Sequence, residues 1–134
     1  MDRRKMLGLS AGVLAAGAAG SAIGAETEAE TCDAGCTDCT SACLACVDAC
    51  LNEVSAGNAG FKACIKLCLD CADICSACAS VSARKGPMAK VMAVACAEAC
   101  EKCAAECEKH DDATCKECAK RCRACAKECR ASAA

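Results

Sequence analysis

The sequence predicts an all-α protein, an antiparallel up-down-up-down bundle of four helices with a cysteine-lined core. Its 20 cysteines fall into four groups, within which they follow one another at steps of three or four residues. Such steps average about 3.5 residues, the period of one stripe along a helix in a bundle. The segments that carry the groups are of similar length, and the links between them are short. Short links favour antiparallel neighbours, so the four stripes are expected to face one common core.

The first 25 residues are predicted to be an export signal. Arg3 and Arg4 precede an apolar run over 7–23 that is made largely of Ala and Gly, and small residues follow it. A pair of arginines before a mildly apolar segment resembles a twin-arginine signal, which exports folded proteins. We therefore expect a periplasmic protein, with residues 26–134 forming the bundle. The alternative is an uncleaved N-terminal anchor, because the run nearly reaches the roughly 18 residues of a membrane-spanning helix.

The first helix is predicted to run from Thr27 to about Val54. Thr27 and Glu30 have the spacing of a capping box, which favours a helix start at this point. A turn is expected over 55–60, which contains two glycines and an asparagine. The second helix is then expected over 61–83.

Turn residues also bound the third and fourth helices. Gly86 suits the left-handed conformation that often follows a helix, and Pro87 suits the first turn of the next one. The third helix is therefore expected over 87–109. Asp111 or Asp112 can cap the fourth helix, which continues to about residue 130.

The charges fit this arrangement and exclude one class of partner. The first predicted helix is acidic and the last is basic, so the two are expected to pair as neighbours, although each exposed ion pair contributes only ~0–1 kcal/mol. The chain has a net charge of −2 and a single aromatic residue. Neither a basic excess nor interleaved aromatic residues indicate a nucleic-acid partner.

A second apolar line follows the cysteines of the first helix by one position. It consists of Leu44, Val47, Leu51 and Val54. These side chains are expected to complete the seams between helices around the thiols. The alternative is that they form a surface for self-association.

Aliphatic packing alone cannot hold the last helix. From residue 111 onward the sequence has no Leu, Ile, Val, Met or Phe, so its inward face offers only Ala and Cys. Apolar burial contributes roughly 25 cal/mol per Å², and these side chains bury little area. Free thiols pack as small hydrophobes, disulfides crosslink, and metal–thiolate bonds do both. The composition leaves a choice among these three.

The spacing of the cysteines favours metal over disulfides. Cβ atoms at i and i+4 lie roughly 5–6 Å apart, whereas a disulfide requires about 3.5–4.5 Å. Cys32 and Cys36 are the first of nine such pairs. Two thiolates at this spacing can hold a two-coordinate ion, and soft thiolates select Cu(I). One Cu(I) per thiolate would also leave the core neutral, whereas four-thiolate Zn(II) sites would each keep two buried negative charges.

All the cysteines are therefore candidate ligands for multiple Cu(I) ions. They are Cys32, Cys36, Cys39, Cys43, Cys46, Cys50, Cys64, Cys68, Cys71, Cys75, Cys78, Cys96, Cys100, Cys103, Cys107, Cys115, Cys118, Cys122, Cys125 and Cys129. Metallothionein-like zinc or cadmium detoxification, and a disulfide-stapled structural or redox bundle, are the alternatives. Iron–sulfur binding is disfavoured because no stretch has the ferredoxin spacing. Thiols this redundant and inward-facing do not suggest an enzyme.

The repeated stripe, the scarcity of aromatic residues and the twin-arginine-like start together resemble the bacterial copper storage proteins. The resemblance covers the whole chain after the signal. It implies a four-helix bundle that stores Cu(I) in the cell envelope on thiolate pairs from CxxxC motifs, and that forms homo-oligomers. It also implies a copper chaperone or a copper enzyme as recipient. Members of the family place Met and His at an open end where copper enters, so Met88, Met92 and His110 are the candidate uptake residues.

Overall fold

The computed structural model describes residues 28–134, with side chains from Cys32 onward, and within this range it contains helices and no strand. The four long helices are α1 (Glu28–Ser55), α2 (Lys62–Ala83), α3 (Ala89–Cys107) and α4 (Ala113–Ala133). A short 3-10 turn, η2 (Ala59–Phe61), precedes α2. The predicted all-α fold is confirmed. The export signal predicted for residues 1–25 and the capping box predicted at Thr27 lie outside the described residues.

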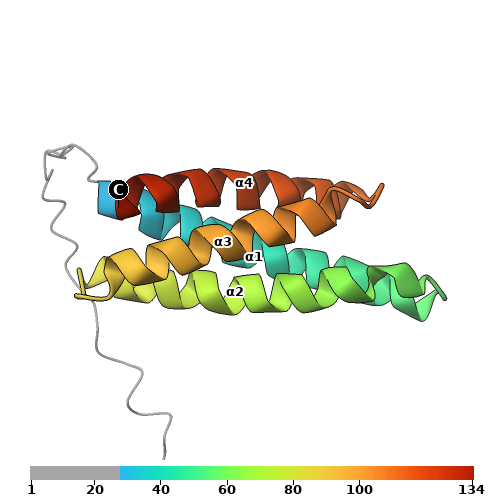
Figure 1. The fold of residues 1–134 in the computed structure, drawn as a ribbon. Helices are drawn as coiled ribbons and strands as arrows, with labels where there is room; N and C mark the ends of the chain where they lie inside the picture. The colour runs from blue at the N-terminus through green and yellow to red at the C-terminus, as the bar shows by residue number, and fades with distance from the viewer. Residues whose placement is uncertain (1–27) are drawn as a thin grey trace, which may run out of the picture.

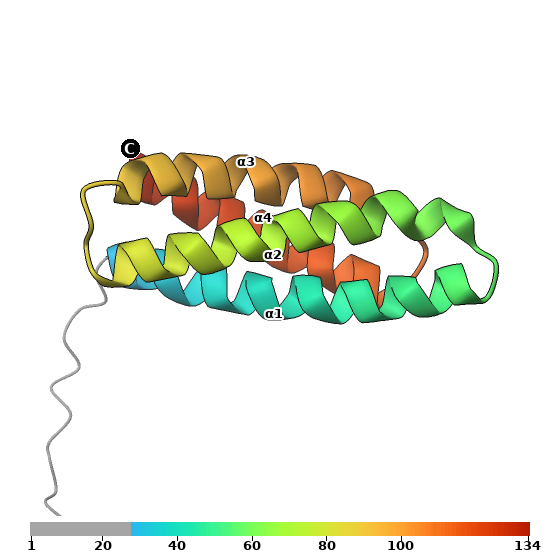
Figure 2. The same ribbon diagram turned by 90° about the horizontal axis from the view of Figure 1, so that it is seen from below.

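The helices form an antiparallel bundle in which each one packs against two neighbours. α1 lies beside α2 and α4, and α3 lies beside the same two helices on the other side (Figure 1). The view in Figure 2 shows two distinct ends. At the α2–α3 end, the turn between these helices lies near the start of α1 and the end of α4. At the α1–α2 end, the turn after α1 lies near the link between α3 and α4.

Sulfur fills the interior of the bundle. Each of the 20 cysteines is buried, with no more than 1% of its surface exposed. Alanines occupy the remaining inward positions of α3 and α4, among them Ala97, Ala104, Ala119 and Ala126. The buried residues of α4 are all cysteine or alanine. The 3.5-residue stripe therefore produced the core that it predicted, because every thiol on it faces the bundle axis.

The start of α4 is capped as the sequence predicts, whereas the end of α2 differs from the prediction. The carboxylate of Asp112 accepts a hydrogen bond from the Cys115 N–H at 2.9 Å, so Asp112 caps α4 as predicted. The prediction that Gly86 is left-handed is wrong, since the residue with positive φ after α2 is Lys85, at 52°. Pro87 also precedes α3, which begins at Ala89.

Two hydrogen bonds explain why Lys85 takes the left-handed position. The N–H of Lys85 donates to the carbonyl of Ser82, and the N–H of Gly86 donates to the carbonyl of Val81, both at 3.0 Å. This pair of bonds is the Schellman motif. In it, the residue that precedes the donor of the bond spanning five residues is left-handed, and here that residue is Lys85. Gly86 thus stands one position after the site where glycine is usual.

The ion pairs between helices differ from the expected pattern. Arg130 of α4 pairs with Glu101 of α3, and Arg123 of α4 pairs with Glu108, the residue that follows α3. The first and last helices are neighbours as expected, but within the described range no ion pair joins α4 to α1, so salt bridges do not account for their pairing. By length and composition alone, Cys32–Ser55 could also span a membrane, which is a weak signal because its cysteines face the bundle core.

The second apolar line on α1 is only partly used in packing. Val47 contacts the core cluster, as expected. Leu44 and Leu51, however, are 51% and 49% exposed, so the prediction that they complete the helix seams is wrong. The small thiol and alanine side chains let the helices approach without them.

Candidate metal centre

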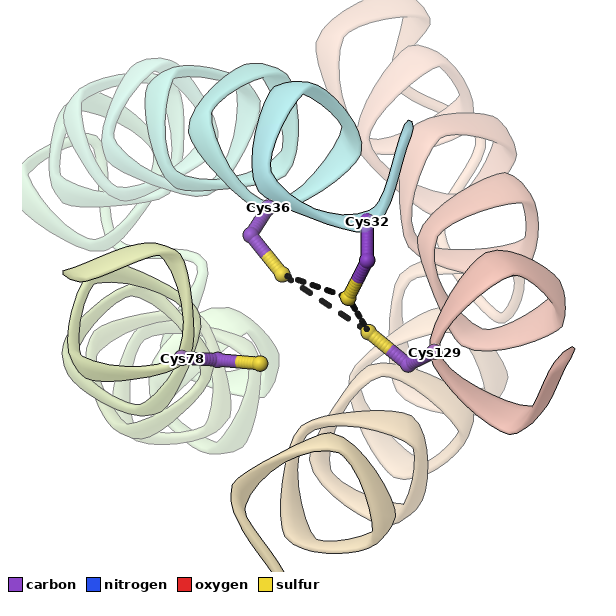
Figure 3. Close-up of side chains that lie close together, drawn as sticks. All are labelled: Cys32, Cys36, Cys78 and Cys129. Atoms are coloured by element: carbon purple, nitrogen blue, oxygen red, sulfur yellow. Dashed lines mark hydrogen bonds between the residues drawn. The ribbon is translucent and has the colours of Figure 1, made fainter. Parts of the chain in front are cut away.

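The cysteine stripes of the four helices merge into one column of sulfur along the bundle axis. Sets of four thiols have all their Sγ atoms within 4.8 Å of one another. At the α2–α3 end, Cys32 and Cys36 of α1, Cys78 of α2 and Cys129 of α4 converge on one point (Figure 3). Because the next set shares Cys36 and Cys129 with this one, the sets are linked along the column.

Contacts within one helix account for only part of this arrangement. Seven of the nine predicted CxxxC pairs have their Sγ atoms 3.8–4.0 Å apart, as Cys32 and Cys36 do. Contacts between helices are as short or shorter. Cys32 and Cys129, and likewise Cys75 and Cys96, lie 3.3 Å apart. Each thiol therefore has possible partners for a metal ion both along its helix and across the core.

These spacings suit a thiophilic ion with two to four ligands. With metal–sulfur bonds of about 2.3 Å, two thiolates in line lie about 4.6 Å apart, three lie about 4.0 Å apart and four lie about 3.8 Å apart. The observed contacts of 3.3–4.0 Å are already close to the three- and four-ligand values. A two-coordinate ion would need a CxxxC pair to open by about 0.6–0.8 Å, which a small χ1 rotation provides. No disulfide joins the cysteines, all of which are free.

Burial and sulfur hydrogen bonds divide the thiols by acidity. Hydrogen bonding with Cys100 lowers the pKa of Cys39 to about 7 and that of Cys96 to about 6. Burial raises the pKa of Cys50 to about 11, and it also raises that of Cys115. Thiols with raised and with lowered pKa alternate along the column, since the pKa of Cys129 is also raised at the α2–α3 end and that of Cys64 is lowered at the α1–α2 end by hydrogen bonding with Cys107. Since a metal binds the thiolate, loading must displace protons from the protonated members.

The three candidate uptake residues are not brought together. Met92 packs against the cysteine core, whereas Met88 is 55% exposed, and both lie at the α2–α3 end. His110 lies at the α1–α2 end, where its ring stacks on Phe61 with centroids 4.4 Å apart. Its Nε2 is also 3.3 Å from a carboxylate oxygen of Glu106. His110 therefore contacts Phe61 and Glu106 at the α1–α2 end, away from the two methionines.

Ser82 is a site residue that the sequence analysis missed. It is buried, and its Oγ lies 3.9 Å from Cys78 Sγ. Ser82 follows Cys78 by four residues, so it continues the stripe of α2 with oxygen in place of sulfur. The signal in the sequence is the step of four residues from Cys78, the last cysteine of α2, to Ser82.

Comparison with protein families gives one match. The family described as copper storage protein (Csp) matches residues 25–134. No curated protein matches the chain.

Solved structures of similar proteins share both sequence and fold. The Cu(I)-bound copper storage protein BsCsp3 is 39% identical with a TM-score of 0.75, over 81% of this chain and 100% of that one. Apo-Csp3 from Bacillus subtilis is also 39% identical, with a TM-score of 0.72 over 79% of this chain and 99% of that one. The Streptomyces lividans protein Ccsp, loaded with 10 copper equivalents, is 34% identical with a TM-score of 0.73, over 79% of this chain and 83% of that one.

Proposed function

The chain belongs to the copper storage protein family, and we propose that it stores and buffers Cu(I) on the cysteine thiolates of its bundle core. The observation that carries this function is the continuous column of 20 buried thiols, whose four-membered sets share residues. A structural core would not need sulfur at so many inward positions, since alanine and leucine pack at least as well. The related proteins with bound Cu(I) support the choice of metal.

The chemistry of storage follows from soft thiolates in a dry interior. Cu(I) accepts two or three thiolate ligands, and one ion per thiolate leaves the core without net charge. With thiolates that bridge neighbouring ions, loading can approach about one Cu(I) per cysteine. Each ion displaces protons from the thiols that it binds. Because neighbouring sets share cysteines, an ion can move along the column by exchanging one ligand at a time.

All 20 cysteines serve as ligands in this proposal, and the α2–α3 end admits the metal. Met92 supports this choice of end, because its thioether is a soft ligand that already packs against the core. Met88 is exposed nearby and can capture the ion first. Bonds this numerous and buried release copper slowly, so delivery needs a competing chelator, a chaperone or a recipient copper enzyme.

Export to the periplasm is part of the proposal and is supported by the paired Arg3 and Arg4 before a mild apolar run. The similar protein from Streptomyces lividans is described as cytosolic, so the location needs its own test. Replacing both arginines by lysine should retain the protein in the cytoplasm if the twin-arginine route is used. Equal amounts of both forms in the periplasmic fraction would contradict that route.

Association with further copies of the chain is also proposed. Apolar side chains on the bundle surface support it, since Leu44, Leu51, Val91 and Val94 are each about half exposed. Light scattering of the reduced protein measures the mass in solution. A mass equal to one chain at all concentrations would contradict the proposal.

An anaerobic titration tests the central function. Cu(I) is added to the reduced protein in the presence of a chromophoric chelator, and Zn(II) is titrated in parallel. Binding of many Cu(I) ions, approaching the thiol count, before the chelator captures any is the expected result. Retention of a few Zn(II) ions but no Cu(I) would contradict copper storage.

A further inference from the structure

A pocket of about 410 Å³ opens at the α2–α3 end of the bundle. It lies between the α2–α3 turn and the last turn of α4, and it is lined by Ser82, Lys85, Gly86, Pro87, Lys90 and Ser132, among others. Among the residues that the structure describes, no acidic one lines it. Its volume falls within the range of pockets that hold small molecules.

The pocket carries uncompensated positive charge. Lys85 and Lys90 both line it, and neither takes part in an ion pair within the described part of the chain. The N-terminus of α3 on the same side carries positive partial charge, but the C-termini of α2 and α4, which lie at this end too, carry negative partial charge, so the helix ends add no net positive charge and the lysines supply the charge of the pocket. The two lysines favour an anionic occupant.

Lys85 occupies its position at a conformational cost. It has φ of 52°, a left-handed conformation that glycine adopts freely and lysine does not. Gly86 is the next residue, so a glycine one position earlier would have relieved the strain. Backbone strain of this kind is concentrated at functional sites.

One side chain separates this pocket from the sulfur column. Ser82 lines the pocket, and its Oγ is 3.9 Å from Cys78 Sγ. Cys78 belongs to the set with Cys32, Cys36 and Cys129 (Figure 3). An occupant of the pocket would therefore be adjacent to the terminal thiols of the column.

We propose that the pocket binds a small anionic thiolate complex of Cu(I) and passes the ion to Cys78 and its neighbours. This step rests on the storage function proposed above. Cu(I) held by two low-molecular-weight thiolates that carry carboxylates is an anion, which matches the positive charge of the lysines that line the site. Two bonds from copper to the carrier sulfurs break as two bonds to protein cysteines form. The two protons displaced from the protein thiols go to the released carrier thiolates, and copper stays Cu(I).

Transfer kinetics from two donors test the assignment. The full-length reduced protein is mixed anaerobically with Cu(I) as its anionic glutathione complex or as its cationic acetonitrile complex. Replacing Lys85 and Lys90 by Gln should slow transfer from the glutathione complex about tenfold at low salt and less at high salt. Transfer from the acetonitrile complex should not slow. The matched control replaces Lys62 and Lys66, two exposed lysines near the other end of α2, by Gln and should leave both rates unchanged.

A second pair of measurements separates charge from folding. Lys85→Gly removes the same charge while relieving the backbone strain, so it should slow transfer from glutathione without lowering the melting temperature. S-Methylglutathione, which cannot deliver copper, should shift the amide resonances of the α2–α3 turn in the apo wild type but not in the double Gln variant.

The outcomes distinguish the two proposals. If neither donor loads the wild type, copper storage itself fails. If both donors load it at rates that the Lys85 and Lys90 substitutions leave unchanged, or slow equally, the pocket assignment is overturned while storage stands. Resonance shifts at the control lysines instead of the turn would also overturn it.

Discussion

One carboxylate oxygen of Glu128, on α4, is buried against the backbone of Gly35, on α1, and has no hydrogen-bond partner among the described residues. A Cβ atom at Gly35 would overlap that oxygen. The glycine therefore makes room for a charged group at a helix interface where the surrounding residues do not compensate it.

Replacing Gly35 by Ala should stabilise the apo protein by about 1 kcal/mol. Alanine is the better residue inside a helix by about this amount, and the atom that it displaces is the tip of a side chain that can rotate into water. Urea unfolding of the reduced protein measures the change. The same substitution in a Glu128→Ala background isolates the helix contribution. A loss of more than 1 kcal/mol in the wild-type background would mean that the carboxylate cannot move.

The stability contributed by Glu128 should depend on pH in a definite direction. Burial raises the pKa of Glu128, and the nearby Cys125 and Asp38 raise it further. A carboxyl with a raised pKa in the folded state contributes its stability below the unfolded value near 4.5, and this contribution is lost as pH rises through the folded pKa. Glu128→Gln should therefore be more stable than wild type at pH 7 and equally stable at pH 4.

Unfolding curves of the two proteins at both pH values provide the comparison. Glu117→Gln, on the exposed side of α4, is the matched control, since its partner Arg121 is also exposed. A greater effect of Glu128→Gln at pH 4 than at pH 7 would contradict the assignment.

Lys85→Gly should stabilise the α2–α3 turn by about 1 kcal/mol. The residue is left-handed, and glycine adopts that conformation without the steric cost of a Cβ atom. Arg84→Gly is the control, because Arg84 has φ of −89° and gains nothing from glycine. The melting temperature should rise for Lys85→Gly and fall for Arg84→Gly. Equal destabilisation would show that the side chain of Lys85 holds the turn.

Removal of copper should loosen α4 more than the other helices. Its buried residues are only cysteine and alanine. Those of α3 are too, but α3 also packs Met92 against the core, and α1 and α2 pack Val47, Ile65 and Ile74 there. Without metal–thiolate bonds, α4 has the least apolar burial to hold it. Amide hydrogen exchange of apo and Cu(I)-loaded protein should show the largest gain in protection over Ala113–Ala133. Equal gains in all four helices would contradict this expectation.

The period of the cysteines was enough to predict the bundle and the burial of every thiol, because a 3.5-residue stripe can face only one direction. It was not enough to predict that Cys32 and Cys129 lie closer than Cys32 and Cys36. Distances between helices depend on how far each helix is shifted along the axis, and the residues of one stripe do not contain that information. The left-handed conformation of Lys85 follows from two backbone hydrogen bonds at the end of α2. The presence of Gly86 in the sequence predicted the turn but placed the left-handed residue one position too late.

The shared membership of the four-thiol sets gives the protein fault tolerance. Cys36 belongs to two sets, so the oxidation of one of its neighbours leaves it with other partners. Oxidation of single thiols would lower the number of Cu(I) ions that the protein binds in small steps. The arrangement therefore does not make the whole column depend on any one four-thiol set.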